Sequence, residues 1–501
     1  MALKLHNAVG IRIGNKEVHE IKLDNKIVWA NDRFCVEYAI AARNITDTVD
    51  EMYNSQYSFY LPRIYDADDK FTFNYEKILI YKTNGEMTTN VKTLACEVSK
   101  IKLWYPKETS RISFMSYKYT SETSSDILSN CITRCYSVDT SNFTSMSSMF
   151  YNCVFLKYVY LEKCNTSKIK SIAGMFRGCR SLITLDSISN WDVSELESIS
   201  NAFTACNGIV KVDLSKWNCP KLNNMYSAFN TCSNLEELHL PKGLRNIISL
   251  ESAFKSCERL TTITGMEDWS CPINYISYAF SGCTSLKSLV APNLLGEGTT
   301  AKSIYEVFLD CRSIENIDIR NWNVSKADEL IGIFENCLVL ESIDLSCWRP
   351  VEVNYMRRLF DTCRSLKTLD LSNWETGTIQ SADYFCYDCR SLETFNAPTI
   401  PNISLLDLDY AFANCVSLKE IDLTCWNVYP SHCSLMSMLA HCTSLRKINL
   451  SNWDTTSTFS AMDMFLNVPS DVDWCYDGTN YTKFKVTEDH TGFSGTFPWN
   501  Q

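Results

Sequence analysis

A repeat of about 26 residues runs through most of this 501-residue chain and limits what the chain can fold into. An apolar anchor, usually phenylalanine, is followed three residues later by cysteine, and successive anchors are 25 to 28 residues apart. One such unit cannot bury its own apolar residues, so neighbouring units must stack. The anchors are Phe150, Phe176, Phe203, Phe229, Phe254, Phe280, Phe308, Phe334, Phe360, Cys386, Phe412, Leu439 and Phe465.

Each unit contains two hydrophobic periods. Before the cysteine, apolar residues at steps of three and four, such as Ile169, Ile172, Phe176 and Cys179, predict a short helix with one buried side. After the cysteine, alternating residues such as 366–371 predict a short strand with one buried face. The sequence therefore predicts an α/β solenoid, with a parallel strand ladder on one side and short helices on the other.

The spacing of one unit also resembles a known family. Cys363 to Trp374 reads Cys-x-x-Leu-x-x-Leu-Asp-Leu-Ser-x-Trp, and it is followed by an apolar stretch ending in an anchor and a cysteine. This pattern resembles the BspA-like leucine-rich repeat of bacterial surface proteins. The resemblance covers about residues 131–468 and implies a leucine-rich-repeat solenoid that serves adhesion or recognition. The signal peptide and the anchor of secreted members are not recognisable in the sequence.

Four segments are predicted along the chain. Residues 1–33 read as a small β-meander for attachment, and residues 34–125 alternate like a β-rich domain. Residues 126–468 form the solenoid, and residues 469–501 close its end as a cap. Residues 13–29 resemble the opening of many bacteriophage tail and virion proteins.

Half of the 24 cysteines form one column of the repeat. One cysteine per unit, always three residues after a buried position, indicates a ladder of small buried side chains rather than converging metal or redox ligands. Cys386 and Cys389 form a Cys-x-x-Cys pair, which is a weak zinc signal because both are repeat positions. The column consists of Cys153, Cys179, Cys206, Cys232, Cys257, Cys283, Cys311, Cys337, Cys363, Cys389, Cys415 and Cys442. No metal and no cofactor are expected.

Aspartates recur at the outward end of the predicted strands. One interpretation is that each carboxylate caps backbone amides of the turn after its strand. The other is that the column is an acidic recognition face that contacts a partner or holds calcium, because carboxylates stacked at strand spacing repel one another unless they are compensated. The candidate recognition face consists of Asp186, Asp213, Asp318, Asp344, Asp370 and Asp422.

Two further features have competing explanations. A tryptophan after most strands suits either packing at a turn or stacking against a carbohydrate, and the fixed position favours packing. Three units lose this tryptophan and gain proline at Pro241, Pro292 and Pro398. Their loops are expected to leave the common path, so they are candidate recognition loops or merely irregular repeats.

Composition excludes several classes of function. Asp and Glu outnumber Lys and Arg by 58 to 47, which argues against nucleic acid and anionic membrane surfaces as partners. Apolar stretches are too short for membrane insertion. The sequence contains no phosphate-binding loop, nucleophile elbow or metal-binding histidine spacing, so no enzyme is expected.

These features favour a bacteriophage virion protein, associated with the tail, over the other functions considered. Its N-terminal region would attach to other virion proteins, and its repeats would bind a glycan or protein on the host surface. A bacterial cell-surface adhesin is the main alternative, and an architectural head fibre or decoration protein is another. The array could also associate with further copies of itself.

Overall fold

The computed structural model describes residues 132–400, 407–426 and 434–450 with their side chains, together with residues 101, 102, 104–106, 109–114, 462–469 and 472. Elsewhere it describes only the backbone of the strands named below. The chain divides into two compact units, Met1–Leu196 (unit 1) and Glu197–Gln501 (unit 2), and each is described by itself.

Unit 1 contains a six-stranded sheet with the strand order β15-β14-β5-β10-β8-β9. β14 pairs antiparallel with β5 but parallel with β15, so it is the strand at which antiparallel pairing gives way to the parallel ladder of the repeats. The strands of this sheet are β5 (Cys35–Ile40), β8 (Lys77–Lys82), β9 (Met87–Thr88), β10 (Val98–Trp104), β14 (Ile132–Val138) and β15 (Tyr158–Val159).

The other strands of unit 1 form small antiparallel sheets. The segment predicted as a β-meander contains two hairpins, β1 with β2 and β3 with β4. β6 pairs with β7 and β11, and β12 pairs with β13. Their bounds are β1 (Ile11–Ile13), β2 (Lys16–Val18), β3 (Glu20–Leu23), β4 (Lys26–Ala30), β6 (Arg63–Tyr65), β7 (Phe71–Thr72), β11 (Arg111–Ser113), β12 (Ser116–Thr120) and β13 (Ser124–Leu128).

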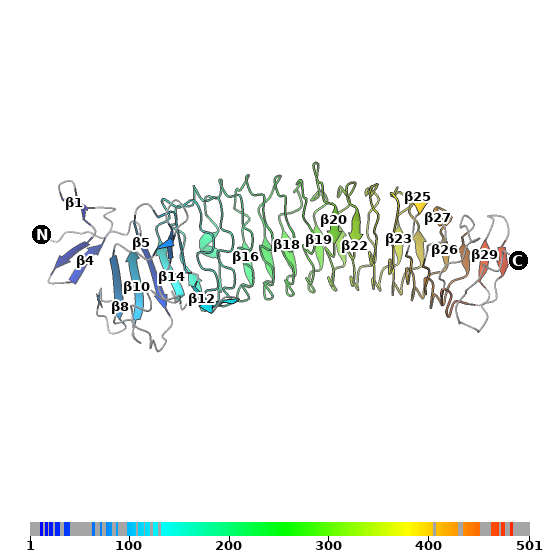
Figure 1. Ribbon diagram of the computed structural model, residues 1–501, viewed down its shortest axis with the longest axis horizontal. Helices are drawn as coiled ribbons and strands as arrows, with labels where there is room; N and C mark the ends of the chain where they lie inside the picture. The colour runs from blue at the N-terminus through cyan, green and yellow to red at the C-terminus, as the bar shows by residue number, and fades with distance from the viewer. Residues whose placement is uncertain are drawn as a thin grey trace. The chain divides into compact units, whose positions relative to one another are not determined.

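Unit 2 is a stack of repeat turns whose short strands pair in parallel (Figure 1). Equivalent residues lie opposite one another without a shift, as in Leu369 and Phe395 of β23 and β24. The middle residue of each strand faces inward, so the predicted strand and its buried face are confirmed. These strands are β16 (Lys211–Asp213), β17 (Glu237–His239), β18 (Thr262–Thr264), β19 (Ser288–Val290), β21 (Asn316–Asp318), β23 (Thr368–Asp370), β24 (Thr394–Asn396), β26 (Glu420–Asp422) and β28 (Lys447–Asn449).

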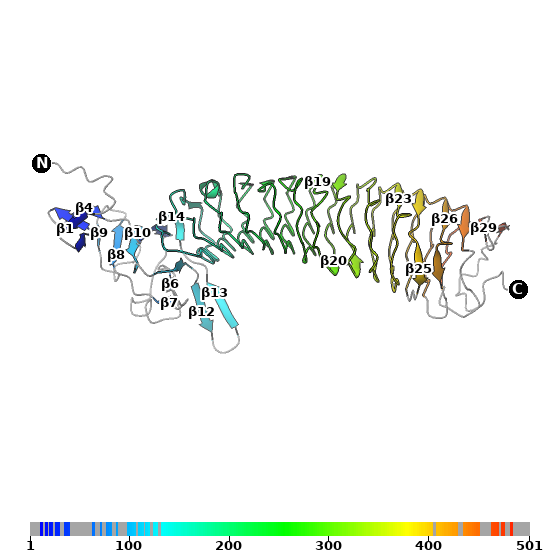
Figure 2. The same ribbon diagram turned by 90° about the horizontal axis from the view of Figure 1, so that it is seen from above.

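Shorter ladders run along other sides of the same turns. Figure 2 shows β19 and β23 along one edge of unit 2 and β20 along the opposite edge. β20 pairs in parallel with β22, and β25 pairs in parallel with β27. The pairing of β28 with β29 instead continues the first ladder, and β30 joins β29 antiparallel. The bounds are β20 (Ser303–Tyr305), β22 (Glu329–Ile331), β25 (Ile400–Ile403), β27 (Trp426–Val428), β29 (Asp473–Cys475) and β30 (Tyr481–Lys483).

The short helices predicted before each cysteine are wrong: overlapping turns occupy those positions. Each described repeat has residues in the left-handed region two positions before and two positions after the anchor, as at Arg358 (φ 52°) and Thr362 (φ 59°) around Phe360. Such residues end an α-helix. The single helix in the described part of the chain is the 3-10 helix η2 (Asp186–Ile188).

The backbone hydrogen bonds show how these turns are stabilised. The amides of Arg358 and Phe360 donate to carbonyls of the next turn at 3.0 and 2.9 Å, whereas the Asp361 amide donates back to Arg358 within its own turn at 3.2 Å. Alternate amides therefore point to the neighbour and to the same turn, and the backbone is satisfied without a helix. Apolar spacing of three and four suits this chain of turns as well as it suits a helix.

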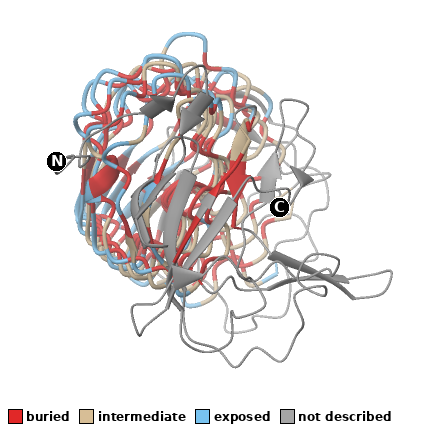
Figure 3. Ribbon diagram, turned by 90° about the vertical axis from the view of Figure 1, so that its left-hand side faces the viewer, coloured by how far each residue is buried: buried red, intermediate tan, exposed pale blue. Residues whose placement is uncertain are grey.

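Anchor side chains form a continuous ladder inside the coil. The rings of Phe334 and Phe360 stack with centroids 5.2 Å apart. Where Cys386 replaces the anchor, Phe385 turns inward and meets the rings of Phe360 and Phe412 edge-on at 5.9 and 6.1 Å. Aromatic pairs of this kind add about 0.5–1.5 kcal/mol each beyond the area that they bury. Figure 3 shows buried and exposed residues alternating around the turns.

Tryptophans form a second ladder at the corner after the strands. The indole rings of Trp348 and Trp374 stack at 5.8 Å, and each indole N–H donates to a carbonyl of the preceding turn. Their buried positions confirm the packing interpretation. The donors and acceptors are Trp191 to Leu161, Trp269 to Pro241, Trp322 to Ala291, Trp348 to Ile319, Trp374 to Leu345 and Trp426 to Pro398. Trp453 lies outside the described residues.

Candidate recognition surface

Two outward-facing strips of unit 2 can be compared as recognition surfaces. The strand face is formed by the outward side chains of β16 to β19, β21, β23, β24, β26 and β28, together with Asp344 at the equivalent position of its repeat, and it carries five aspartates of the column. The turn face is formed by the outward side chains at the positions five, three and two before each anchor and one and two after it. β20 and β22 belong to the turn face.

Most aspartates of the strand face bind their own backbone. Asp370 accepts the amide of Ser372 at 3.0 Å and its hydroxyl at 2.7 Å. Asp318 instead forms two hydrogen bonds of 2.9 Å with the guanidinium group of Arg320. The same amide bond, from the residue two positions on, is found at Asp213, Asp344, Asp370 and Asp422.

These contacts favour the ionised form of four aspartates. Hydrogen bonds from the serine hydroxyl and amide two residues on lower the pKa of Asp213, Asp344 and Asp370. The Arg320 guanidinium lowers the pKa of Asp318. The geometry thus favours the capping interpretation, and a recognition role for this column stays a prediction.

Asp186, the sixth candidate, lies in unit 1. It is exposed in η2, where its backbone carbonyl accepts the hydroxyl of Ser189 at 2.9 Å. Within the part of the chain that the structure describes, no three histidine, cysteine, aspartate or glutamate side chains are grouped to hold a metal ion.

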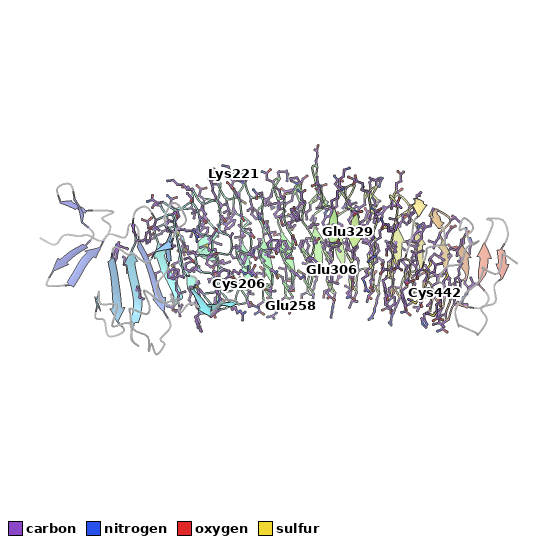
Figure 4. The ribbon with its side chains drawn as sticks, viewed as in Figure 1. Cys206, Lys221, Glu258, Glu306, Glu329 and Cys442 are labelled. Carbon is purple, nitrogen blue, oxygen red and sulfur yellow. The ribbon has the colours of Figure 1, made fainter. Side chains whose placement is uncertain are left out.

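The cysteine column lies behind the turn face, where all twelve of its members are buried with free thiols. Cys363 donates its S–H to the carbonyl of Phe334, the anchor of the preceding turn, at 3.0 Å. Equivalent bonds of 3.0–3.4 Å recur from Cys179 to Cys442, and Figure 4 labels Cys206 and Cys442 at the two ends of the column in unit 2. Burial raises the pKa of Cys232 and Cys283 to about 12, so these thiols stay protonated.

The expectation that the proline-containing loops leave the common path is wrong for their described residues. The carbonyl of Pro241 accepts the indole N–H of Trp269, and that of Pro292 accepts the amide of Asn321 at 3.0 Å. The Pro398 carbonyl likewise accepts an indole from the next turn. These loops therefore continue the hydrogen-bonded coil.

Tyrosines gather on the turn face, a feature that the sequence analysis missed. All eight tyrosines that the structure describes with side chains in unit 2 lie at turn-face positions. The signal is present in the repeat alignment, because three of them share the position two before the anchor. The eight are Tyr226, Tyr275, Tyr278, Tyr305, Tyr355, Tyr384, Tyr387 and Tyr410.

Contacts between turns fix several of these rings. Tyr384 stacks on Tyr410 with centroids 5.0 Å apart, and the guanidinium carbon of Arg358 lies 4.5 Å from its centroid. Tyr387 meets Tyr384 edge-on at 5.3 Å. Lys255 lies 4.2 Å over the ring of Tyr278 in the same way. The rings are therefore held in place before any partner arrives.

Carboxylates surround these tyrosines, and their environment differs from that of the strand face. Tyr305 donates its hydroxyl to Glu329, which Figure 4 labels beside Glu306 of the preceding turn. Burial, followed by the neighbouring charge of Asp361, raises the pKa of Glu335 to about 7. Burial also raises the pKa of Asp361 and Asp407. Burial thus raises the pKa of these three carboxylates, whereas hydrogen bonds lower the pKa of the strand-face aspartates named above.

A family model covers just over half of the chain. Residues 115–242 and 274–397 match the model described as "Mycoplasma protein of unknown function, DUF285". The chain belongs to the DUF285 family. Residues 356–468 of this DUF285 protein also match the BspA type leucine-rich repeat region in six copies, which supports the resemblance seen in Cys363 to Trp374.

The solved structures similar to this DUF285 chain include bacterial leucine-rich-repeat proteins. One from Bacteroides ovatus is 20% identical, covers 68% of this chain and 88% of its own, and has a TM-score of 0.40. A leucine rich cell surface protein from Faecalibacterium prausnitzii is 16% identical, covers 79% and 92%, and has a TM-score of 0.31. Likeness at this level carries no argument about function. No curated protein matches the sequence.

The two family matches include the tyrosines of the turn face. Tyr226 and residues 274–397 lie in DUF285 segments, and Tyr410 lies in the BspA-type segment. The stretch between the DUF285 segments, residues 243–273, contains the turn with Gly265 and no tyrosine. Among the described residues, no helix is long and apolar enough to cross a membrane.

Proposed function

We propose that this DUF285 protein is displayed on a bacterial cell surface and binds a ligand through its repeat array, as an adhesin. The match of residues 356–468 to BspA-type repeats is the observation that carries the proposal. The array suits binding because its backbone is satisfied between turns and its outward side chains are fixed by their neighbours. Binding needs no chemical step in this proposal.

The virion alternative depends on residues 13–29, which both family matches leave out. The comparisons give no support to a tail-associated role, so we keep that role only as an outcome of the test. An architectural fibre would place the chain in the same particles.

The test is quantitative mass spectrometry of two fractions from one producing culture. Peptides released from intact cells by brief protease treatment are compared with density-purified particles, using a cytoplasmic enzyme as the control for lysis. We expect chain peptides in the cell-surface digest and reduced adherence of cells that lack the gene. A constant ratio of the chain to capsid protein in the particles would overturn the proposal.

A further inference from the structure

We propose that the turn face between Tyr275 and Tyr410 binds a protein segment rich in lysine and arginine, rather than a glycan. This inference rests on the proposed function and names the partner class for the same array. Two observations carry it: the ring faces at the centre of the patch are already covered, and its carboxylates outnumber its cations.

The first observation concerns ring faces. A sugar stacks on an exposed aromatic face, but Tyr384 lies between Arg358 of the preceding turn, at 4.5 Å, and Tyr410 of the following turn, at 5.0 Å. Arg357 similarly lies 5.4 Å over the ring of Tyr355. What such rings offer is edges and hydroxyl groups on a rigid support, which is how tyrosine serves at the centre of protein interfaces.

The second observation is charge. Between residues 306 and 409, nine acidic residues lie on the turn face, and all five nearby arginines form ion pairs with them. Asp388, whose side chain is 5% exposed, is held between Arg364 and Arg390 at 2.8 Å each. The acidic residues are Glu306, Asp310, Glu329, Glu335, Asp361, Asp383, Asp388, Asp407 and Asp409, and the arginines are Arg312, Arg357, Arg358, Arg364 and Arg390.

The carboxylates of the turn face that have no arginine or lysine partner leave a surplus of negative charge for a partner protein to contact. In the described part of the chain, Glu306, Glu329, Asp407 and Asp409 form no salt bridge. Glu329 accepts the hydroxyls of Ser303 and Tyr305, and Asp407 and Asp409 each accept a backbone amide, but none of these contacts neutralises the carboxylate charge. Lysine and arginine side chains of a partner can bind these carboxylates and also rest on the edges of the tyrosine cluster. A second copy of this chain, with its net charge of −11, is a poor occupant.

The variants are chosen so that the fold survives. Tyr384 and Tyr410 both have positive φ, of 55° and 57°, a conformation that asparagine tolerates well. The double variant Tyr384→Asn/Tyr410→Asn therefore removes two rings without straining the turns. Asp370→Asn/Asp422→Asn is the matched control on the strand face, because asparagine keeps an acceptor for the capped amides. Glu306→Gln/Glu329→Gln tests the charge alone.

The full-length chain and its variants are probed with synthetic peptides that combine lysine or arginine with aromatic residues, and with an array of printed glycans. We expect the chain to bind basic peptides and not glycans. The double tyrosine variant should bind at least about tenfold more weakly, as expected for the loss of interface hot spots. The glutamate variant should associate more slowly and depend less on salt, and the strand-face control should bind like the wild type.

Two results would overturn the inference. One is binding to glycans with no binding to basic peptides, and the other is undiminished binding by a folded double tyrosine variant. Adherence of cells carrying each variant separates this failure from failure of the proposed function. Tyrosine-variant cells that adhere like the wild type, when cells without the gene do not, would overturn the turn face alone. A chain missing from the cell surface would overturn the proposed function, while peptide binding would still decide for or against the turn face.

Discussion

The strand face and the turn face of unit 2 are formed by the same repeat, and the backbone of both is hydrogen-bonded between turns. Their polar side chains nevertheless contact different groups. On the strand face, carboxylates such as Asp370 bind the amide two residues further along. On the turn face, side chains such as Tyr384 bind side chains of neighbouring turns. The comparison teaches that a column of charge is not by itself a binding surface, because local backbone groups can use up its hydrogen bonds.

The largest expected effect is on stability, and it comes from adding a Cβ to a glycine on each face. Gly265 follows β18 with φ +100°, and a Cβ there would lie 2.2 Å from the carbonyl oxygen of Leu240. At Gly332 on the turn face, φ is +58° and a Cβ would meet only the side chains of Glu306 and Glu335 at 3.1 Å. We expect Gly265→Ala to lower the free energy of unfolding by at least about 3 kcal/mol, and Gly332→Ala by about 1–2 kcal/mol.

Urea unfolding of both glycine variants measures this difference. An equal loss in the free energy of unfolding for both variants would mean that the backbone around Gly265 shifts to accommodate a Cβ. The backbone there would then not be more closely packed than the backbone at Gly332.

Cysteine gives the second comparison, because the chain has it on both sides. Cys363 is buried behind the turn face and donates its S–H to the Phe334 carbonyl. Cys347 is exposed, three residues after Asp344 of the aspartate column. Cys363→Ala loses that bond and leaves a small void, so we expect a cost of about 1–2 kcal/mol. Cys347→Ala should change stability by less than about 0.5 kcal/mol. Thermal unfolding under reducing conditions tests both, and a stable Cys363→Ala variant would mean that the thiol ladder is dispensable.

Much of this fold could be predicted from the sequence. The spacing of the anchors requires stacked units, and alternation in residues such as 368–370 gives the strands and their buried face. The helix prediction failed because apolar spacing of three and four does not distinguish a helix from successive turns. Glycine or asparagine on both sides of the anchor, as at Gly174 and Gly178, points to turns in two repeats, but most repeats have other residues at these positions. Contacts between turns, which no single unit reveals, stabilise that conformation.

The candidate surface was harder to predict than the fold. The aspartate column is conspicuous in the sequence, but its capping contacts become visible only when the turn after each strand is in place. The tyrosines are scattered over four positions of the repeat, and only folding brings them onto one strip. Tyr278, Tyr384 and Tyr410, which share the position two before the anchor, could have indicated it.

The third comparison exchanges side chains on each face. Asp370→Ala leaves the amide of Ser372 without its acceptor, so we expect a loss of about 1 kcal/mol, whereas Asp370→Asn should lose only a few tenths. Tyr384→Asn loses ring contacts but relieves a tyrosine at positive φ, so the two effects should nearly cancel. Urea unfolding of the three variants checks the order. A larger loss for Tyr384→Asn than for Asp370→Ala would mean that the tyrosine cluster stabilises the array.

The smallest expected effect is a difference in the sign of the pH dependence. Hydrogen bonds lower the pKa of Asp370, so its contribution to stability is present above its ordinary pKa and is lost as pH falls through the folded value. Burial raises the pKa of Glu335 to about 7, so its contribution is present below the ordinary value of 4.5 and is lost as pH rises through about 7. Acid should therefore reduce the contribution of Asp370 on the strand face, and a rise to neutral pH that of Glu335 on the turn face.

Urea unfolding of the wild type, Glu335→Gln and Asp370→Asn from acid to above neutral pH tests these two opposite pH dependences. Glutamine stays neutral, so the Glu335→Gln variant should gain on the wild type as pH rises from about 4.5 to above 7. Asparagine cannot be protonated in this range, so the Asp370→Asn variant should lose less than the wild type in acid. Both effects should be modest because water reaches the two carboxylates. Parallel profiles for all three proteins would mean that the two faces do not differ in their electrostatics, and the carboxylate surplus alone would then have to account for any preference for a basic partner.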